Sequence, residues 1–214
     1  MKLRWYFVCY VVYPIVKIIF GVKVSGRKNL RPTSGKIIAA NHTSNFDPVI
    51  IGFVAGQEIS FLAKAELFHF RKWFSWLIRF WNAYPVKRDA MDLGLFKTCS
   101  SLLQKNQTLL LFPEGTRNKA DNLLPFKPGI GLLAVTNSVP VIPCHVYGLR
   151  KSFISKIVDP DINPGKIRLG DLFSSRITIK FGNPIPPNGF KRNRIDYENF
   201  ASKIQNAVEQ LSDK

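Results

Sequence analysis

Acidic residues are scarce in this 214-residue sequence, in which 14 Asp and Glu stand against 31 Lys and Arg. The formal charge of +17 favours a polyanionic partner, such as nucleic acid, an anionic membrane surface or a phosphorylated substrate. No helix-turn-helix, zinc-finger or aromatic RNA-binding pattern occurs, so we expect no nucleic-acid partner. The 17 Phe and 4 Trp, several of them beside basic residues, favour a membrane surface carrying anionic lipid.

Cysteine is also rare, and Cys9, Cys99 and Cys144 have neither the spacing of a metal site nor that of a disulfide framework. We expect them to be reduced packing residues in a protein that faces the cytosol. His69 and His145 have no carboxylate at ligand spacing. The sequence therefore predicts no metal and no cofactor.

An uninterrupted apolar run of about 20 residues, the length of a membrane-spanning helix, is missing as well. Residues 5–22 are apolar, but Pro14, Lys17 and three tyrosines interrupt them. A signal peptide would need a small-residue cleavage site after this segment, and none follows. Because basic residues flank it on both sides, we expect residues 1–22 to form a membrane-anchoring helical segment on the cytoplasmic leaflet. A transmembrane helix is the alternative.

The remaining residues, 23–214, are long enough for a single domain with its own core. Apolar runs typical of buried strands alternate with helical stretches, which predicts an α/β fold with a mixed, largely parallel sheet flanked by helices. Residues 68–81 combine tryptophan with basic residues, and we expect an interfacial helix there rather than an ordinary core helix. A helix starting near Asp89 and a linker over 155–172 are also expected. The expected strands are VKVSG, KIIAA, EISFLA, NAYPV, TLLLF, VPVIPCHVYG and RITIKF.

The motif NHTSNFDP, residues 41–48, follows the apolar run KIIAA. His42 and Asp47 are five residues apart, which is about 140° around a continuous helix, so they can meet only across a turn. Turn residues separate them, and Pro48 fits the first position of a helix. Two interpretations stay open. Either Asp47 orients the His42 ring for proton abstraction, or Asp47 only caps a helix and His42 is a loop residue.

A second motif, FPEGTRN at 112–118, follows the run TLLLF, at the strand end where open α/β sheets bind ligands. Gly115 lets the backbone approach a ligand closely. Thr116 offers a hydroxyl and Arg117 a two-pronged guanidinium, both suited to phosphate. Glu114 is expected to pair with Arg117 or to bind a substrate hydroxyl, and a tight turn held by a Glu114–Arg117 salt bridge is the alternative.

Four motifs occur in a fixed order between residues 24 and 150, namely NHTSNFDP, YPVKRD, FPEGTRN and VPVIPC, with FLAKAELF after the first. In this order they resemble the glycerophospholipid acyltransferase family, in particular the 1-acylglycerol-3-phosphate acyltransferases. The resemblance implies a glycerol-3-phosphate acyltransferase-like fold, with His42 as general base and Asp47 as its orienting partner. YPVKRD is the loosest match. The residues implied to bind the phosphorylated acceptor are Lys64, Arg88, Glu114, Gly115 and Arg117.

The reaction implied by the resemblance moves a fatty acyl group from acyl-CoA or acyl carrier protein to the sn-2 hydroxyl of lysophosphatidic acid, giving phosphatidic acid. A thioester is already activated and no GxSxG motif occurs, so we expect direct attack by the hydroxyl, with Ser44 as the less favoured nucleophile. Backbone amides in the 43–47 turn or near Gly115 are the expected oxyanion donors. The alternatives are another lysophospholipid or lyso-aminolipid acceptor, and a non-catalytic basic protein that binds membranes.

Overall fold

The structure, a computed structural model, describes residues 6–31, 35–70, 72–86, 93–118, 120, 122–159, 161 and 176–212. The strands are β1 (Lys23–Ser25), β2 (Lys36–Ala40), β3 (Ile59–Lys64), β4 (Ala83–Val86), β5 (Thr108–Leu111), β6 (Val141–Tyr147) and β7 (Thr178–Phe181). The helices are η1 (Val8–Val12), α2 (Tyr13–Ile19), η2 (Arg27–Leu30), α3 (Asp47–Ala55), α4 (Leu67–Phe70), α5 (Lys72–Phe80), α6 (Leu93–Gln104), α7 (Gly129–Asn137), α8 (Phe153–Val158) and α10 (Arg194–Gln210).

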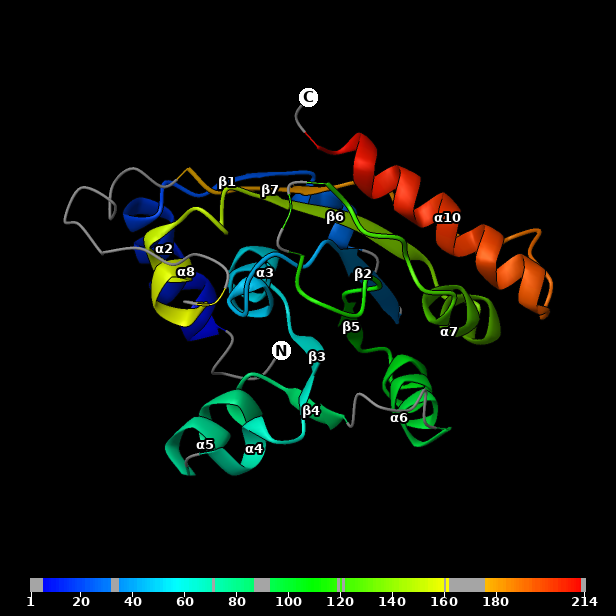
Figure 1. The fold of residues 1–214 in the computed structure, drawn as a ribbon, viewed down its shortest axis with the longest axis horizontal. Coiled ribbons are helices and arrows are strands. Elements are labelled where there is room, and N and C mark those ends of the chain that lie inside the picture. The colour runs from blue at the N-terminus through cyan, green and yellow to red at the C-terminus, as the bar shows by residue number, and fades with distance from the viewer. Residues whose placement is uncertain are drawn as a thin grey trace.

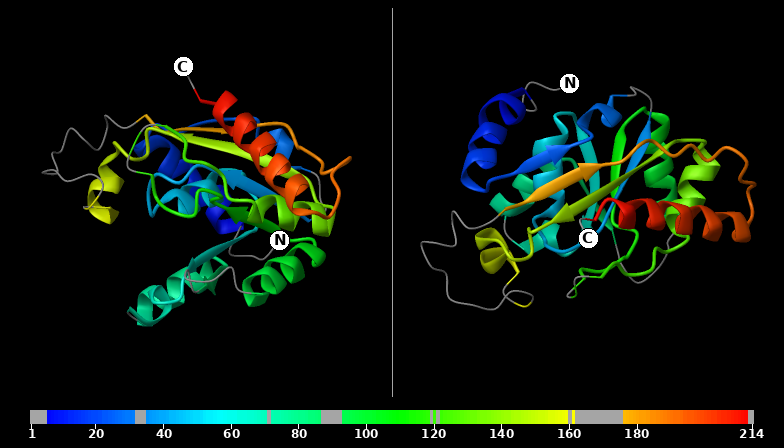
Figure 2. Two further views of the ribbon diagram at one scale, coloured as in Figure 1. Left: turned by 45° about the vertical axis from the view of Figure 1, so that its right-hand side comes forward. Right: turned by 90° about the horizontal axis from the view of Figure 1, so that it is seen from above.

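The strands form one seven-stranded sheet in the order β1-β7-β6-β2-β5-β3-β4. β6 and β7 pair antiparallel, whereas the other neighbouring strands pair parallel. The expected mixed, largely parallel sheet is therefore confirmed. Helices cover both of its faces, and α7 and α10 lie side by side on one of them (Figures 1 and 2).

The central strand β2 shows why the sequence KIIAA is apolar after its first residue. Its five residues are all buried. Ile37 and Ala39 join the core beneath α6, α7 and α10, whereas Ile38 and Ala40 join the core beneath α3 on the opposite face. Because successive side chains of a strand point to opposite faces, a strand covered by helices on both sides is apolar along most of its length.

The parallel pairing of β2 with β5 and β6 brings three loops to one edge of the sheet. β2 and β5 are aligned from Lys36 opposite Thr108, and β2 and β6 are aligned from Ile37 opposite Val141. The segments that follow these strands, 41–47, 112–118 and 148–151, therefore start at the same edge. This is the edge at which open α/β sheets bind their ligands.

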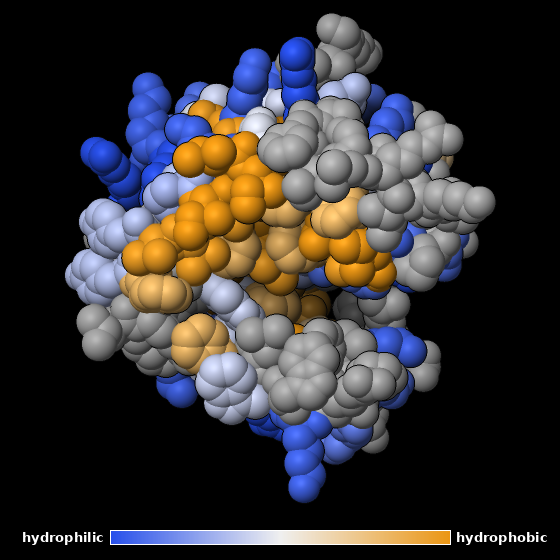
Figure 3. All heavy atoms as spheres, turned by 90° about the vertical axis from the view of Figure 1, so that its left-hand side faces the viewer, coloured by the Kyte–Doolittle hydropathy of each residue, from blue (hydrophilic) through white to orange (hydrophobic). Residues whose placement is uncertain are grey.

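The N-terminal segment is helical from residue 6 to residue 19, through η1 and α2. Among the described residues, no helix has both the length and the apolar character needed to cross a bilayer. Apolar side chains gather on the face of the molecule where α2 lies (Figure 3). The large exposed apolar residues of this segment are Tyr6, Phe7, Tyr10, Val11, Ile15 and Ile18.

Two expected elements differ from the structure or are only partly covered by it. The stretch expected to be a linker, 155–172, begins inside helix α8, whose Ser152 cap accepts a hydrogen bond from the Ser155 amide. Its later part lies outside the described residues, as does Asp89. The expected helix at 68–81 forms as α4 and α5, with Trp76 64% exposed, but the side chains of Trp73 and Leu77 are not described.

Cys99 and Cys144 are fully buried free cysteines, which supports their expected packing role. Burial raises the pKa of Cys99 to about 11 and raises the pKa of Cys144 as well. At pH 8 both thiols should be protonated and inaccessible, so a folded Cys9→Ser variant should take up less than about 0.1 equivalent of maleimide. Mass spectrometry in buffer and in urea measures this uptake. Rapid labelling of the folded variant would contradict the buried placement.

Candidate active site

His42 and Asp47 face each other across the turn that joins β2 to α3. Nδ1 of His42 lies 2.8 Å from Oδ2 of Asp47, and the carboxylate is fully buried. A carboxylate accepts hydrogen bonds, so Nδ1 carries the proton and Nε2 is left with a free lone pair. The turn therefore brings the carboxylate to the ring, as the first of the two interpretations of NHTSNFDP requires, and the catalytic roles of the pair stay a prediction.

The expected capping role of Asp47 is wrong. Its side chain makes no cap hydrogen bond to α3, which begins at Asp47 itself with Pro48 in its first turn. Instead, Asp47 Oδ2 accepts the backbone N–H groups of Thr43 and Ser44 at 2.6 and 2.8 Å, in addition to the imidazole. Three donors on one oxygen fix the carboxylate against the histidine.

The amides of the 43–47 turn all have acceptors inside the protein. Besides the two bound to Asp47, the amides of Asn45, Phe46 and Asp47 donate to the Asp159 carboxylate, Ser44 Oγ and Ser44 O, each at 3.1 Å. None of the five is available for an oxyanion without breaking a bond. Within the described residues the Thr116 amide donates no hydrogen bond, so the segment after Gly115 is the better source of the donor.

Glu114 holds the backbone of His42 and does not pair with Arg117. Its Oε1 accepts the His42 N–H at 2.8 Å, and its Oε2 accepts Leu124 N–H at 3.1 Å and Asn118 Nδ2 at 3.3 Å. The Asn118 N–H in turn donates to His42 O at 2.7 Å. Burial raises the pKa of Glu114, and these hydrogen bonds oppose that shift. Both polar backbone groups of His42 are thus tied to the FPEGTRN segment.

The His42 ring stacks on Phe112, with ring centroids 4.2 Å apart and planes inclined by 21°. Only 11% of the histidine side chain is exposed. Ser44 is fully buried, and its hydroxyl donates to Asp159. This placement removes Ser44 as a candidate nucleophile.

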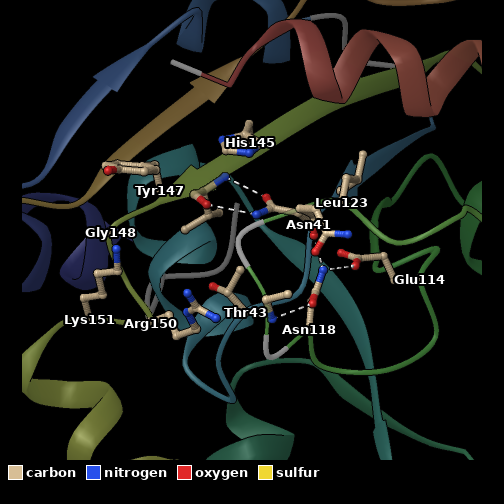
Figure 4. Close-up of a pocket in the computed structure, with 13 residues that line it drawn as sticks. Asn41, Thr43, Glu114, Asn118, Leu123, His145, Tyr147, Gly148, Arg150 and Lys151 are labelled. Atoms are coloured by element: carbon tan, nitrogen blue, oxygen red, sulfur yellow. Dashed lines mark hydrogen bonds between the residues drawn. The ribbon is translucent and has the colours of Figure 1, made fainter. Parts of the chain in front are cut away.

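A pocket opens beside this turn, between the loop after β6 and the segment 118–123 (Figure 4). Thr43 and Glu114 belong to its wall, and Arg150 and Lys151 give the wall two cationic side chains. Asn41 closes the floor, because its side-chain amide exchanges two hydrogen bonds with the Val146 backbone at 2.7 and 2.9 Å. The 41–47 turn is therefore bordered by a recess whose wall carries two cationic side chains and one carboxylate.

The segment that carries these motifs, residues 21–147, matches the family model described as Acyltransferase. The chain belongs to the acyltransferase family. Its fold agrees with this membership, since the crystal structure of the 1-acyl-sn-glycerophosphate (LPA) acyltransferase PlsC from Thermotoga maritima superposes with a TM-score of 0.69. That structure is 27% identical in sequence, and the match covers 100% of this chain and 85% of the other.

Two curated relatives of this acyltransferase-family chain carry the name 1-acyl-sn-glycerol-3-phosphate acyltransferase. The protein from Bacillus subtilis is 33% identical over 129 residues, which are 60% of this chain and 63% of the relative. The protein from Streptococcus pneumoniae is 29% identical over 183 residues, which are 83% of this chain and 61% of the relative. The match thus spans less than two thirds of the length of each relative.

Arg117 of this family member is bound by two aspartates. Its Nη1 donates to Asp159 Oδ1 at 2.6 Å and to Asp161 Oδ1 at 3.2 Å, and its Nη2 donates to Asp161 Oδ2 at 2.9 Å. Burial lowers the pKa of Arg117, but the bonds from Asp161 and Asp159 outweigh that effect and raise it. The guanidinium is therefore always charged. To bind a phosphate, as expected, it must bind the phosphate together with these carboxylates or in place of them.

Of the other predicted binding residues, the described ones lie at the end of β3 or in the segment that follows β5. Lys64 ends β3, is about half exposed, and lies 3.7 Å from the Glu66 carboxylate. Gly115 has φ of +74°, and a Cβ there would come within 2.6 Å of Lys127 Nζ, so only glycine fits this turn without strain. Thr116 is exposed beside it. Arg88 lies outside the described residues.

Two residues at the site had no assigned role in the sequence analysis. Asn118 is the last residue of FPEGTRN, so its place in that motif was the signal for it, and its burial is seen only in the structure. Asp159 is more than 110 positions from the catalytic turn and stands in the stretch expected to be a linker. No local pattern marks it.

Proposed function

We propose that this protein transfers a fatty acyl group from acyl-CoA or acyl carrier protein to the sn-2 hydroxyl of lysophosphatidic acid, giving phosphatidic acid. One observation carries the proposal, namely the His42–Asp47 pair at 2.8 Å, held directly against the FPEGTRN turn. The names of the relatives support the same reaction. A base next to a cation that suits phosphate is what a phosphorylated alcohol acceptor requires.

His42 acts as the general base in this mechanism. Its Nε2 takes the proton of the acceptor hydroxyl while the hydroxyl oxygen forms a bond to the thioester carbonyl carbon. Asp47 stabilises the imidazolium that results. The tetrahedral intermediate then breaks its carbon–sulfur bond, and the proton on Nε2 passes to the leaving thiolate. Ester and thiol are the products, and His42 returns to its starting state.

The negative charges that need stabilisation in this reaction are the oxyanion of the tetrahedral intermediate and the phosphate of the acceptor. The amide of Thr116 is our candidate for the donor to the oxyanion that develops on the carbonyl oxygen. Arg117, with Lys64 and Arg88, is our candidate set for the acceptor phosphate. The recess lined by Arg150 and Lys151 also includes Thr43 of the turn, and its positive charge favours anionic substrates.

We further propose that the acceptor is taken from a bilayer surface, with the protein on its cytoplasmic face. The exposed apolar side chains of η1 and α2 and the exposed Trp76 of α5 support an interfacial placement. The formal charge of +17 adds attraction to a surface that contains anionic lipid. Both effects bring the site to its lipid substrate.

The test is a thiol-release assay with purified protein, acyl-CoA and lysophosphatidic acid in mixed micelles. We expect free CoA and phosphatidic acid to appear in equal amounts, and CoA release to fall to background without acceptor. The assay is repeated with acyl carrier protein as donor and with other lysolipids as acceptors. Binding to anionic vesicles with no thioester consumption for any donor and acceptor would refute the proposal.

A further inference from the structure

Asp159 lies directly after α8, outside both site motifs, yet its carboxylate reaches both of them. It is fully buried. Its Oδ2 accepts the Ser44 hydroxyl, and both of its oxygens lie 3.1 Å from the Asn45 N–H. Its Oδ1 accepts Arg117 Nη1 at 2.6 Å. The carboxylate therefore joins the catalytic turn to the guanidinium expected to hold phosphate.

The connection continues from Asp159 to the catalytic pair through Ser44. The Ser44 N–H donates to Asp47 Oδ2 at 2.8 Å, and the Asp47 N–H donates back to Ser44 O at 3.1 Å. Asp47 Oδ2 is also the atom that binds the His42 ring. A shift of Ser44 would consequently move the carboxylate that orients the base.

The strength of this connection follows from its burial and charge. Hydrogen bonds to a buried carboxylate are stronger than those between neutral groups, and a buried charge must be paired to be tolerated. Arg117 supplies the opposite charge, and Ser44 and Asn45 supply neutral donors. The second hydroxyl near Asp159, Ser155 Oγ at 3.4 Å, is a weaker contact from α8 itself.

We propose that Asp159 is a positioning residue for acyl transfer, which holds the Ser44–Asn45 turn and Arg117 in one fixed arrangement. The base and the phosphate ligand are then presented to the same acceptor molecule without rearrangement. This inference rests on the proposed function. Asp159 itself touches no substrate and acts through Ser44 and Arg117.

The test compares Asp159→Asn with Asp161→Asn, because both substitutions neutralise a carboxylate bound to Arg117. Asp161 is 51% exposed and holds the outer edge of the guanidinium, so it serves as the matched control. Since misplacing a catalytic group by about 1 Å costs as much as about 10²-fold in rate, we expect Asp159→Asn to lower kcat at least about 10-fold. We expect Asp161→Asn to keep kcat within about 2-fold, and the KM for acyl-CoA to stay unchanged in both.

Ser44→Ala separates positioning from loss of fold, because it removes a single hydroxyl from the same connection. We expect a smaller loss of kcat, and no further loss when Ser44→Ala is added to Asp159→Asn, since groups in one network are not additive. Equal kcat losses in Asp159→Asn and Asp161→Asn would overturn the inference. A wild-type kcat in folded Asp159→Asn would also overturn the inference. So would fully additive losses of kcat when Ser44→Ala is combined with Asp159→Asn.

A measurement that needs no substrate tests the role of Asp159 independently of the proposed function. Amide hydrogen exchange, measured by NMR on the full chain, reports how often the Thr43 and Ser44 amides leave Asp47. We expect the two amides to exchange at least about 10-fold faster in Asp159→Asn than in the wild type, and at the wild-type rate in Asp161→Asn. If Asp159→Asn does not fold, Ser44→Ala takes its place with the same expected result. Unchanged exchange would overturn the inference even if the wild-type protein proved inactive.

Discussion

A His42→Ala variant is expected to lose at least about 10²-fold of kcat while staying folded, because removal of a general base costs about 10² to 10⁴ in rate. In the proposed mechanism His42 is the base, since Asp47 is fully buried and hydrogen-bonded to the histidine ring. Alanine also removes the ring that stacks on Phe112, so some loss of stability will accompany the loss of rate. Thiol release under saturating substrates measures kcat.

The exposed histidine of α4, His69, offers the matched control for this substitution. His69→Ala is expected to keep the wild-type kcat, and both variants should show cooperative urea unfolding. A kcat of His42→Ala within about 3-fold of wild type, in a folded variant, would mean that no base acts at Nε2. The proposed mechanism would then have to be abandoned.

The sheet was predictable from the sequence because its central strands are covered on both faces. KIIAA and TLLLF are apolar at every position after the first, which is typical of a buried strand in an α/β fold. The strand order was not predictable. β1, near the N-terminus, pairs with β7, more than 150 residues later, and this pairing depends on packing that no local pattern encodes. For the same reason the antiparallel direction of β7 was not foreseen.

The contact between His42 and Asp47 was foreseen because both residues belong to one eight-residue motif with a turn between them. The roles of the neighbouring charges were not foreseen, since they depend on burial and on distant partners. Glu114 was expected to pair with Arg117, three residues later, or to bind a substrate hydroxyl. Instead, the buried Glu114 accepts the His42 N–H, and Arg117 pairs with Asp159. The placement of α8 in the fold brings Asp159 to Arg117.

Arg117→Ala is expected to lower kcat/KM for lysophosphatidic acid at least about 10²-fold, because two charge-assisted hydrogen bonds to a phosphate contribute about 3 kcal/mol or more. The same substitution leaves the buried Asp159 carboxylate without its cation, which costs up to about 3–5 kcal/mol of stability. A rate loss alone therefore cannot assign a phosphate role to Arg117. The discriminating measurement needs an acceptor that lacks the phosphate.

Monoacylglycerol is that acceptor, since it offers a glycerol hydroxyl and an acyl chain but no charged group. If Arg117 binds the phosphate, its loss should reduce the preference for lysophosphatidic acid over monoacylglycerol by about 10²-fold, since only one of the two acceptors used the guanidinium. An Arg117→Lys variant, which keeps a cation for Asp159 but lacks the planar fork, should fall between wild type and Arg117→Ala in that preference while regaining stability. An equal loss of kcat/KM with both acceptors would show that Arg117 serves only to pair with Asp159. The phosphate would then have to be bound elsewhere at the edge of the sheet.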